Sequence, residues 1–280
     1  MGRRALLSAV LGTLAAGAAA GQGSEPPAAE VLAERFRTAF ESEEAPAREE
    51  WLGPEAPDPF LVADALFAAL AGGEVQADAW RALDAWCELA ATLPENAALP
   101  ALLARWRGLD AEGRARERAL RERLAGAPGG TPDAELVVAL AESLPSVPRV
   151  LLLAERANAL RLAGRGEEAA AGFEEAAAAA LDLGWIRKAA HALHSAGILH
   201  YRAGRFERAL DAWEREVALH ESVGNGFGLA LALASIADAL EVTGRYRQAL
   251  EQLDRAEEHC DGDRHPSLDA HLHNCLLYTS

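Results

Sequence analysis

Residues 193–213 read LHSAGILHYRAGRFERALDAW, and their pattern recurs on both sides at a fixed distance of 40 residues. Several sets of positions agree in phase without a gap. The matched positions are Leu153, Leu193 and Leu233; Ala157, Gly197 and Ala237; Gly164-Arg165, Gly204-Arg205 and Gly244-Arg245; Ala169, Ala209 and Ala249; and Phe173, Trp213 and Leu253. This agreement indicates three copies of one structural unit.

Each set of positions has a physical reason within a pair of antiparallel helices. The glycine ends the first helix where the chain must reverse, because glycine tolerates left-handed backbone angles. The small residue before it and the alanine after it are expected where two helices approach closely. The large residues are expected to fill the space between one pair and the next. Because a single pair cannot bury both its faces, neighbouring pairs must stack.

The fold class follows from these pairs and from the rest of the chain. No segment alternates with a period of two over a useful length, so strands are not expected. Between positions 78 and 94, Leu83, Trp86, Ala90 and Leu93 recur at helical spacing and predict one buried stripe. The sequence therefore predicts an all-α protein, an α-solenoid of antiparallel helix pairs with additional N-terminal helices.

The order of residue types in each unit resembles the tetratricopeptide (TPR) signature: a small residue, a glycine, an alanine and a large apolar residue at fixed spacing. The resemblance covers residues 150–262, or three repeats, and implies a TPR-like superhelix. The usual unit has about 34 residues, whereas the unit here has 40. The additional residues fall around 181–189 and 219–230, so both helices are expected to be about one turn longer. Such long units are similar to TPR arrays of bacterial multidomain proteins, including those with caspase-like peptidase domains of the CHAT type.

The family resemblance implies that the first helix of each pair lines a concave groove, which takes an extended peptide or a partner's helix. By position, the residues carried over to this partner-binding groove are Asn158, Arg161, His191, His194, Tyr201, Arg202, Asp238 and Glu241. Of these, Arg161 and Arg202 suit an acidic group of the partner, while Asp238 and Glu241 favour a basic one. The lysine-rich clamp of some family members is absent.

Composition and charge exclude several classes of partner. The 280-residue chain carries 43 acidic and 27 basic residues, a formal net charge of -16. Binding to nucleic acid or to anionic lipid needs clustered positive charge, which this chain does not supply. The expected partner is therefore a protein or peptide, without nucleic acid.

The N-terminus resembles a secretory signal peptide. Residues 1–20 combine two arginines, an apolar run and a possible cleavage site after Ala20. Residues 21–29 then form a linker, and residues 30–145 form the N-terminal helical region. The predicted location is exported, periplasmic or extracellular, without stable membrane insertion after cleavage. The three cysteines, Cys87, Cys260 and Cys275, are too few and too far apart for a disulfide framework.

The C-terminal end suggests a fragment. Residues 263–274 look like the first helix of a fourth repeat without its partner helix. Residues 275–280, CLLYTS, resemble translated sequencing-adapter read-through. We expect the natural protein to continue differently after about Asn274.

Candidate chemical groups do not assemble into a catalytic or metal site in the sequence. His191 and His194 are three apart, a spacing that can share a metal, but no third ligand falls on the same face. Ser195 follows His194 directly, and neighbours on a helix point about 100° apart. Cys87 lies within an apolar stripe, which favours a packed thiol over a reactive one. No cofactor, metal or catalytic residue is therefore expected.

The sequence favours an exported TPR scaffold that mediates protein–protein interaction through a concave helical groove, not an enzyme. One alternative is the regulatory or substrate-recruiting N-terminal part of a larger enzyme, such as a CHAT-like peptidase, whose catalytic domain is missing. Another is a structural part of an envelope complex. The identity of the partner and the oligomeric state are not specified by the sequence.

Overall fold

A computed structural model describes residues 58–71, 77–126 and 145–259, and every regular element in these ranges is helical. The predicted all-α fold is confirmed. The described helices fall into two compact units, the first consisting mainly of residues up to Ala125 and the second mainly of residues from Arg149 onward. The predicted signal peptide, linker, fourth repeat and final segment 275–280 lie outside the described residues, as does the start of the predicted N-terminal helical region.

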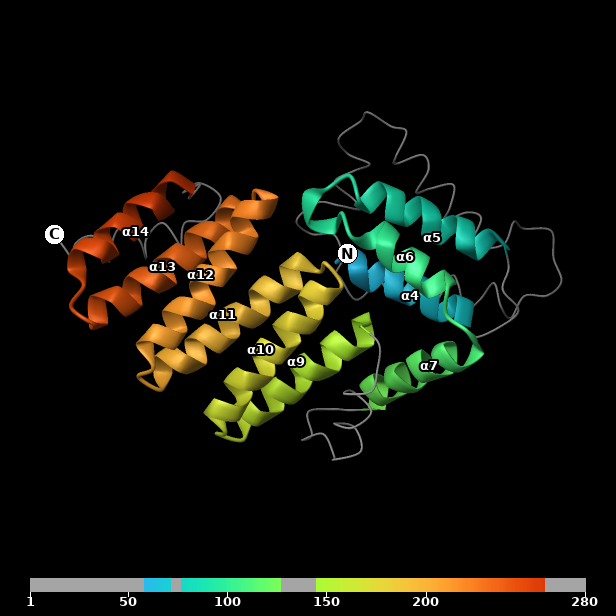
Figure 1. The fold of residues 1–280 in the computed structure, drawn as a ribbon, viewed down its shortest axis with the longest axis horizontal. Coiled ribbons are helices and arrows are strands. Elements are labelled where there is room, and N and C mark those ends of the chain that lie inside the picture. Colours follow the sequence, from blue (N-terminus) through green and yellow to red (C-terminus); the bar gives the residue numbers. More distant parts are fainter. Residues whose placement is uncertain (1–57, 72–76, 127–144, 260–280) are drawn as a thin grey trace, which may run out of the picture. The chain divides into compact units, whose positions relative to one another are not determined.

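Within residues 58–71 and 77–126, the first unit contains four helices and a short 3-10 turn (Figure 1). These are α4 (Pro59–Ala71), α5 (Ala77–Ala90), η1 (Pro94–Asn96), α6 (Leu99–Arg107) and α7 (Ala111–Gly126). The predicted stripe of α5 is buried at Leu83, Trp86 and Ala90, and the Trp86 indole donates to the Pro59 carbonyl at 3.1 Å. Trp106 stacks on Phe67 with ring centroids 4.6 Å apart. These aromatic side chains form the core that the sequence predicts for the N-terminal helices.

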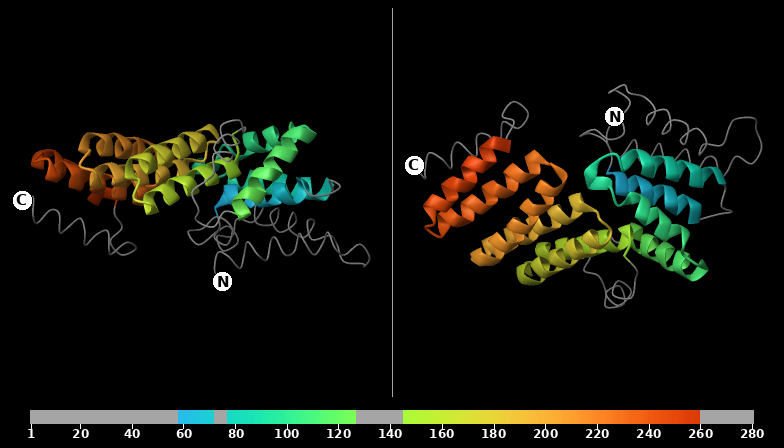
Figure 2. Two further views of the ribbon diagram at one scale, coloured as in Figure 1. Left: turned by 90° about the horizontal axis from the view of Figure 1, so that it is seen from below. Right: turned by 45° about the horizontal axis from the view of Figure 1, so that its top comes forward.

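The described part of the second unit, residues 147–259, is a row of three helix pairs. Figure 2 shows the helices side by side, each antiparallel to the next. The pairs are α9 (Val147–Leu162) with α10 (Gly166–Asp182), α11 (Ile186–Arg202) with α12 (Phe206–Val223), and α13 (Gly226–Val242) with α14 (Tyr246–His259). The pairs coincide with the three predicted repeats, so the expected solenoid is confirmed.

Glycine in the left-handed region marks each reversal of this unit. The predicted glycines Gly164, Gly204 and Gly244 have φ of +75°, +71° and +76°. Gly184 and Gly224, at the reversals between pairs, have φ of +70° and +68°. The 40-residue unit therefore consists of two halves of 20 residues. Because α11 and α12 have 17 and 18 residues, the additional length lies in the helices and not in the reversals.

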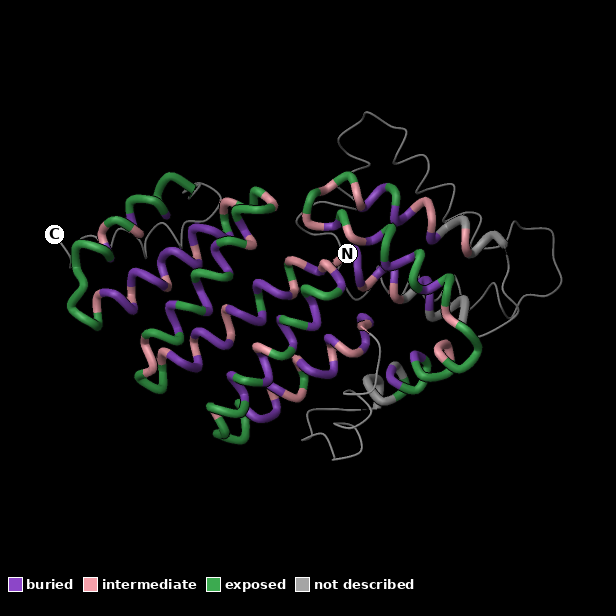
Figure 3. The backbone as a smooth tube through the Cα atoms, viewed as in Figure 1, coloured by how far each residue is buried: buried purple, intermediate pink, exposed green. Residues whose placement is uncertain are grey.

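The large and small columns of the repeat meet in the core. A Cβ atom on Gly197 would lie 2.2 Å from Nε1 of Trp213, and one on Gly172 would lie 3.0 Å from the Ala157 Cβ. Trp213 is only 2% exposed and belongs to the buried cluster that includes Leu233 of α13. The indole thus packs on the small residue of its own pair as well as contributing to the core shared with the next pair. Figure 3 shows the resulting buried positions along α11, α12 and α13.

Candidate functional site

The first helices carry the residues predicted to line a groove. On α9, Arg161 donates from Nε and Nη2 to Oδ1 of Asn158 at 3.1 and 2.7 Å. These two residues therefore form one exposed polar patch. On α11, Arg202 is exposed at the last turn of the helix.

Tyr201 is a partly buried aromatic residue near the end of α11. Its ring lies edge-on to Phe206 at 5.6 Å and at 6.0 Å from the ring of Trp213. It packs against the buried cluster formed by α12, α13 and α14. Desolvation raises the pKa of the Tyr201 phenol, and the negative charges of Asp238 and Glu241 raise it further.

The two predicted histidines of α11 differ in their surroundings. His191 is at the surface, and its pKa is lowered by partial desolvation and then by the positive charge of Lys188. His194 instead turns toward the second helix of its own pair, where Nδ1 lies 3.1 Å from Oε2 of Glu216. Within the described ranges, no three His, Cys, Asp or Glu side chains are placed to hold a metal.

A buried polar network surrounds Glu216. This carboxylate is 2% exposed and lies between His194 and His220, whose Nε2 is 3.6 Å from Oε1. The other ring nitrogen of His220 lies 3.2 Å from Nδ2 of Asn225, and Oδ1 of that asparagine accepts from the Gly228 amide. The network therefore ties α11, α12 and the start of α13 together.

Sequence comparison between repeats contains a signal for this network that was missed. The positions of the other repeats that match His194, Glu216 and His220 are mostly alanine. They are Ala154 and Ala234, Ala176 and Ala256, and Ala180 and Cys260. Polar residues at positions that are small in the other repeats indicate a feature special to the middle pair.

A second histidine–carboxylate contact joins the first pair to the second. His200 of α11 is 3% exposed, and its Nε2 lies 3.1 Å from Oε1 of Glu174 on α10. Leu160 and Leu240 occupy the matching positions of the other repeats. The contact is therefore specific to this junction.

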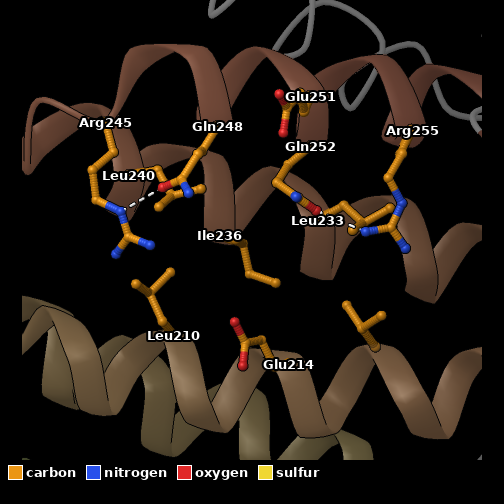
Figure 4. Close-up of a pocket in the computed structure, with 11 residues that line it drawn as sticks. Leu210, Glu214, Leu233, Ile236, Leu240, Arg245, Gln248, Glu251, Gln252 and Arg255 are labelled. Carbon is orange, nitrogen blue, oxygen red and sulfur yellow. Dashed lines mark hydrogen bonds between the residues drawn. The ribbon is translucent and has the colours of Figure 1, made fainter.

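A groove lies at the next junction, between the second helices α12 and α14 and above α13 (Figure 4). Its volume is about 360 Å³. The floor is apolar and consists of Leu210, Val217, Leu233, Ile236 and Leu240. On α13, the floor residues belong to the buried cluster shared with α12 and α14. By helical spacing, Asp238 lies on the opposite side of the helix and Glu241 about 100° from Leu240. The groove is thus distinct from the predicted first-helix surface.

The walls of the groove are polar, and two arginines bridge α14 to α12. Arg245 lies 3.3 Å from Glu207 and donates to Gln248 at 2.6 Å. Arg255 lies 3.2 Å from Glu221 and donates to Gln252 at 2.9 Å. Figure 4 shows the two arginine–glutamine contacts at opposite ends of the groove.

The groove also has two acidic side chains. Glu214 on α12 and Glu251 on α14 line it from opposite walls. Within the described part of the chain, neither carboxylate forms an ion pair or a hydrogen bond. The uncommitted charge of the groove is therefore negative, since both arginines are already paired.

The remaining candidate groups have structural surroundings. Ser195 donates from Oγ to the His191 carbonyl at 3.0 Å, which is a contact within its own helix. Burial raises the pKa of the Cys87 thiol to about 12, and the charge of Asp84 adds to this effect. A thiol with such a pKa stays protonated at neutral pH and is a poor nucleophile. None of the described helices has the length and apolar character needed to cross a bilayer.

Comparison with known proteins identifies one related family. The model of the soluble NSF attachment protein (SNAP) family matches residues 151–277, which is less than half of the chain. The match includes nearly all of the three described pairs, and it runs three residues into the segment 275–280. No curated protein matches the chain significantly. The second unit is therefore a helical repeat scaffold similar to that of SNAP proteins.

Proposed function

We propose that this chain is an exported scaffold that binds a protein partner through its helical repeats and has no chemistry of its own. The observation that carries the proposal is the row of three in-phase helix pairs, together with the family match over the same residues. A family named for attachment supports an interaction role. Rigid helix pairs present a preformed surface, which lowers the ordering cost of binding.

The proposed partner-binding surface is formed by the first helices α9, α11 and α13. It has cationic groups at Arg161 and Arg202 and anionic groups at Asp238 and Glu241. The packing of Tyr201 against the cluster formed by α12, α13 and α14 supports a surface shared by consecutive pairs. We propose that a partner segment crosses this surface, with an acidic group toward the arginines and a basic group toward α13.

Charge reversal tests this surface without removing a packed ring. Tyr201 is unsuitable for this purpose because it contacts Trp213. A tagged full chain is used to isolate and identify the partner, and the purified partner is then titrated against Arg202→Glu and Glu241→Lys. Both variants should weaken binding by about tenfold or more, as expected for loss of a charged hydrogen bond and gain of repulsion.

The matched controls are charge reversals on the exposed side of α14, Arg247→Glu and Glu257→Lys. They change the net charge by the same amount but lie away from the proposed surface. They should leave the affinity within about twofold. If the controls lost as much affinity for the partner as the surface variants, the assignment of the first-helix surface would be refuted.

Export is a separate part of the proposal, and its support is the arrangement of residues 1–20. Expression of the full chain with a C-terminal tag, followed by N-terminal sequencing of the exported fraction, tests it. The mature chain should begin at Gly21. A chain that stays in the cytosol with its first residues intact would contradict export.

A further inference from the structure

The two junctions between helix pairs are built from matching positions but differ in one contact. At the first junction, Glu174 of α10 contacts the buried imidazole of His200 at 3.1 Å. The matching residues of the second junction are Glu214 and Leu240. The glutamate is thus repeated, while its nitrogen-containing partner is replaced by an apolar side chain.

The floor of the second junction is also more apolar in its larger side chains. It contains Leu210 and Ile236 at positions where the first junction has Ala170 and Ala196. With leucine in place of the imidazole, the groove of the second junction has an apolar floor and an acidic wall. At the first junction, the imidazole of His200 complements the matching glutamate by donating a hydrogen bond to it.

The remaining charges of the groove favour the same complement. Arg245 and Arg255 are held at the two ends by Glu207 and Glu221, as described above. The first of these bridges repeats a contact of the first junction, where Arg205 lies 3.4 Å from Glu167. The arginines therefore belong to the framework of the array, and the acidic groups of the walls are left for a partner.

We propose that the groove between α12 and α14 binds a partner segment that places an apolar side chain over Ile236 and donates from a lysine or arginine to Glu214 and Glu251. The groove has a volume of about 360 Å³, which is in the range of pockets that hold small ligands. It therefore has room for side chains of the segment over Ile236. This inference rests on the proposed scaffold function but uses a different face of α13.

The probe is a fluorescein-labelled peptide of about eight residues composed of leucine and lysine, and the readout is fluorescence anisotropy with the full chain. A peptide with glutamate in place of lysine is the matched control for charge. The lysine peptide should bind and the glutamate peptide should not. Equal binding of both peptides, or no binding of the lysine peptide, would overturn the proposal.

Two variants locate the binding site. Glu214→Gln removes the wall carboxylate from an exposed position and should weaken the lysine peptide about tenfold. Its matched control is Glu257→Gln, which removes the same charge from an exposed position of α14 outside the groove and should change the affinity by less than twofold. Equal affinities for these two variants would show attraction to the overall charge only and would overturn the groove assignment.

The second variant, Leu240→His, recreates the first junction inside the second. The new imidazole should contact Glu214 as His200 contacts Glu174, so peptide binding should be lost while the melting temperature shows a folded chain. Retained binding in a folded Leu240→His protein would contradict the proposal. If this variant does not fold, Glu214→Gln still decides the question because its side chain is exposed.

The outcomes separate this inference from the proposed function. Loss of peptide selectivity with intact partner binding at α11 and α13 overturns the groove alone. Selective peptide binding that depends on Glu214, with no effect of Arg202→Glu or Glu241→Lys on the partner, overturns the first-helix surface and supports the groove. Hydrogen exchange of the groove helices is also compared between the full chain and a chain without residues 260–280. Faster exchange in the shorter chain would show that these residues cover the groove and would overturn the proposal.

Discussion

Replacing Gly197 by alanine tests the contact on which the repeat depends. An added Cβ would lie 2.2 Å from Nε1 of Trp213 and 2.6 Å from its Cε2. Ordinary contacts need at least 3.4 Å, so the helix or the indole must move by about 1 Å. Because the indole is rigid and 2% exposed, the movement must spread into the core.

The expected magnitude is a balance of two effects. Overpacking a core costs about 1–3 kcal/mol, and a severe overlap falls at the upper end. Replacing glycine by alanine within a helix returns about 1 kcal/mol. The net loss of unfolding free energy is therefore about 2 kcal/mol, which lowers the melting temperature by about 8 °C if residues 147–259 unfold as one unit.

Urea unfolding followed by far-UV circular dichroism measures this change without relying on the altered tryptophan signal. Gly172→Ala is the matched control, because the atoms nearest to its Cβ would all belong to Ala157, with the methyl at 3.0 Å and the Cα at 3.4 Å. That variant should stay within about 1 kcal/mol of the wild type. The first repeat combines Ala157 with Phe173 at the positions of Gly197 and Trp213.

The double variant Gly197→Ala, Trp213→Phe therefore reproduces a combination that the chain already uses. The alanine should cost about 1–2 kcal/mol less in the phenylalanine background than in the wild type. The packing argument would be refuted if Gly197→Ala were as stable as the wild type, or if its cost were the same in both backgrounds.

Three further predictions concern buried or partly buried groups. Because burial keeps the Cys87 thiol protonated, with a pKa of about 12, it should resist iodoacetamide at pH 8 in a Cys260→Ser, Cys275→Ser background until denaturant is added. Its folded pKa is above the unfolded value near 9, so stability relative to Cys87→Ala should fall as the pH rises above about 9. Rapid native labelling would contradict this. Desolvation and the charges of Asp238 and Glu241 raise the pKa of Tyr201. The phenolate absorbance that is missing in Tyr201→Phe should therefore develop above pH 10, and it should develop at a lower pH in Glu241→Gln. Development of this absorbance below pH 10 would contradict the influence of the two acids. Removing both His194 and His220 should lower the free energy of unfolding by about 3–5 kcal/mol, because it leaves a buried carboxylate without a partner. Adding Glu216→Gln should restore part of this free energy in urea unfolding. If it restores none, the loss is not an effect of the charge.

The repeat phase could be predicted from the sequence because backbone geometry restricts the reversals. A left-handed turn selects glycine, and a close helix approach selects Ala157, Gly197 and Ala237, so these columns are visible in one sequence. The half-period of 20 residues is equally visible in the sequence at Gly184 and Gly224, and it indicates that the reversals between pairs match those within pairs.

The candidate sites were less predictable because they depend on departures from the repeat. Matching columns emphasise what the units share, whereas Glu216 and His200 are informative because the other units have apolar residues there. The orientation of His194 depends on the neighbouring helix and is not fixed by its spacing from His191. The groove is also invisible in any single helix, since its floor and its walls come from α12, α13 and α14.

The central claim is that the helix pairs are stacked copies, with Trp213 enclosed between them. The most direct test is hydrogen exchange of the Trp213 indole N–H in the full chain, assigned by the signal that disappears in Trp213→Phe. Nε1 lies 3.4 Å from the His194 carbonyl in a position that is almost fully buried. The account predicts exchange that is strongly slowed and becomes fast only on unfolding. Exchange at the rate of a solvent-exposed indole in the folded protein would contradict it.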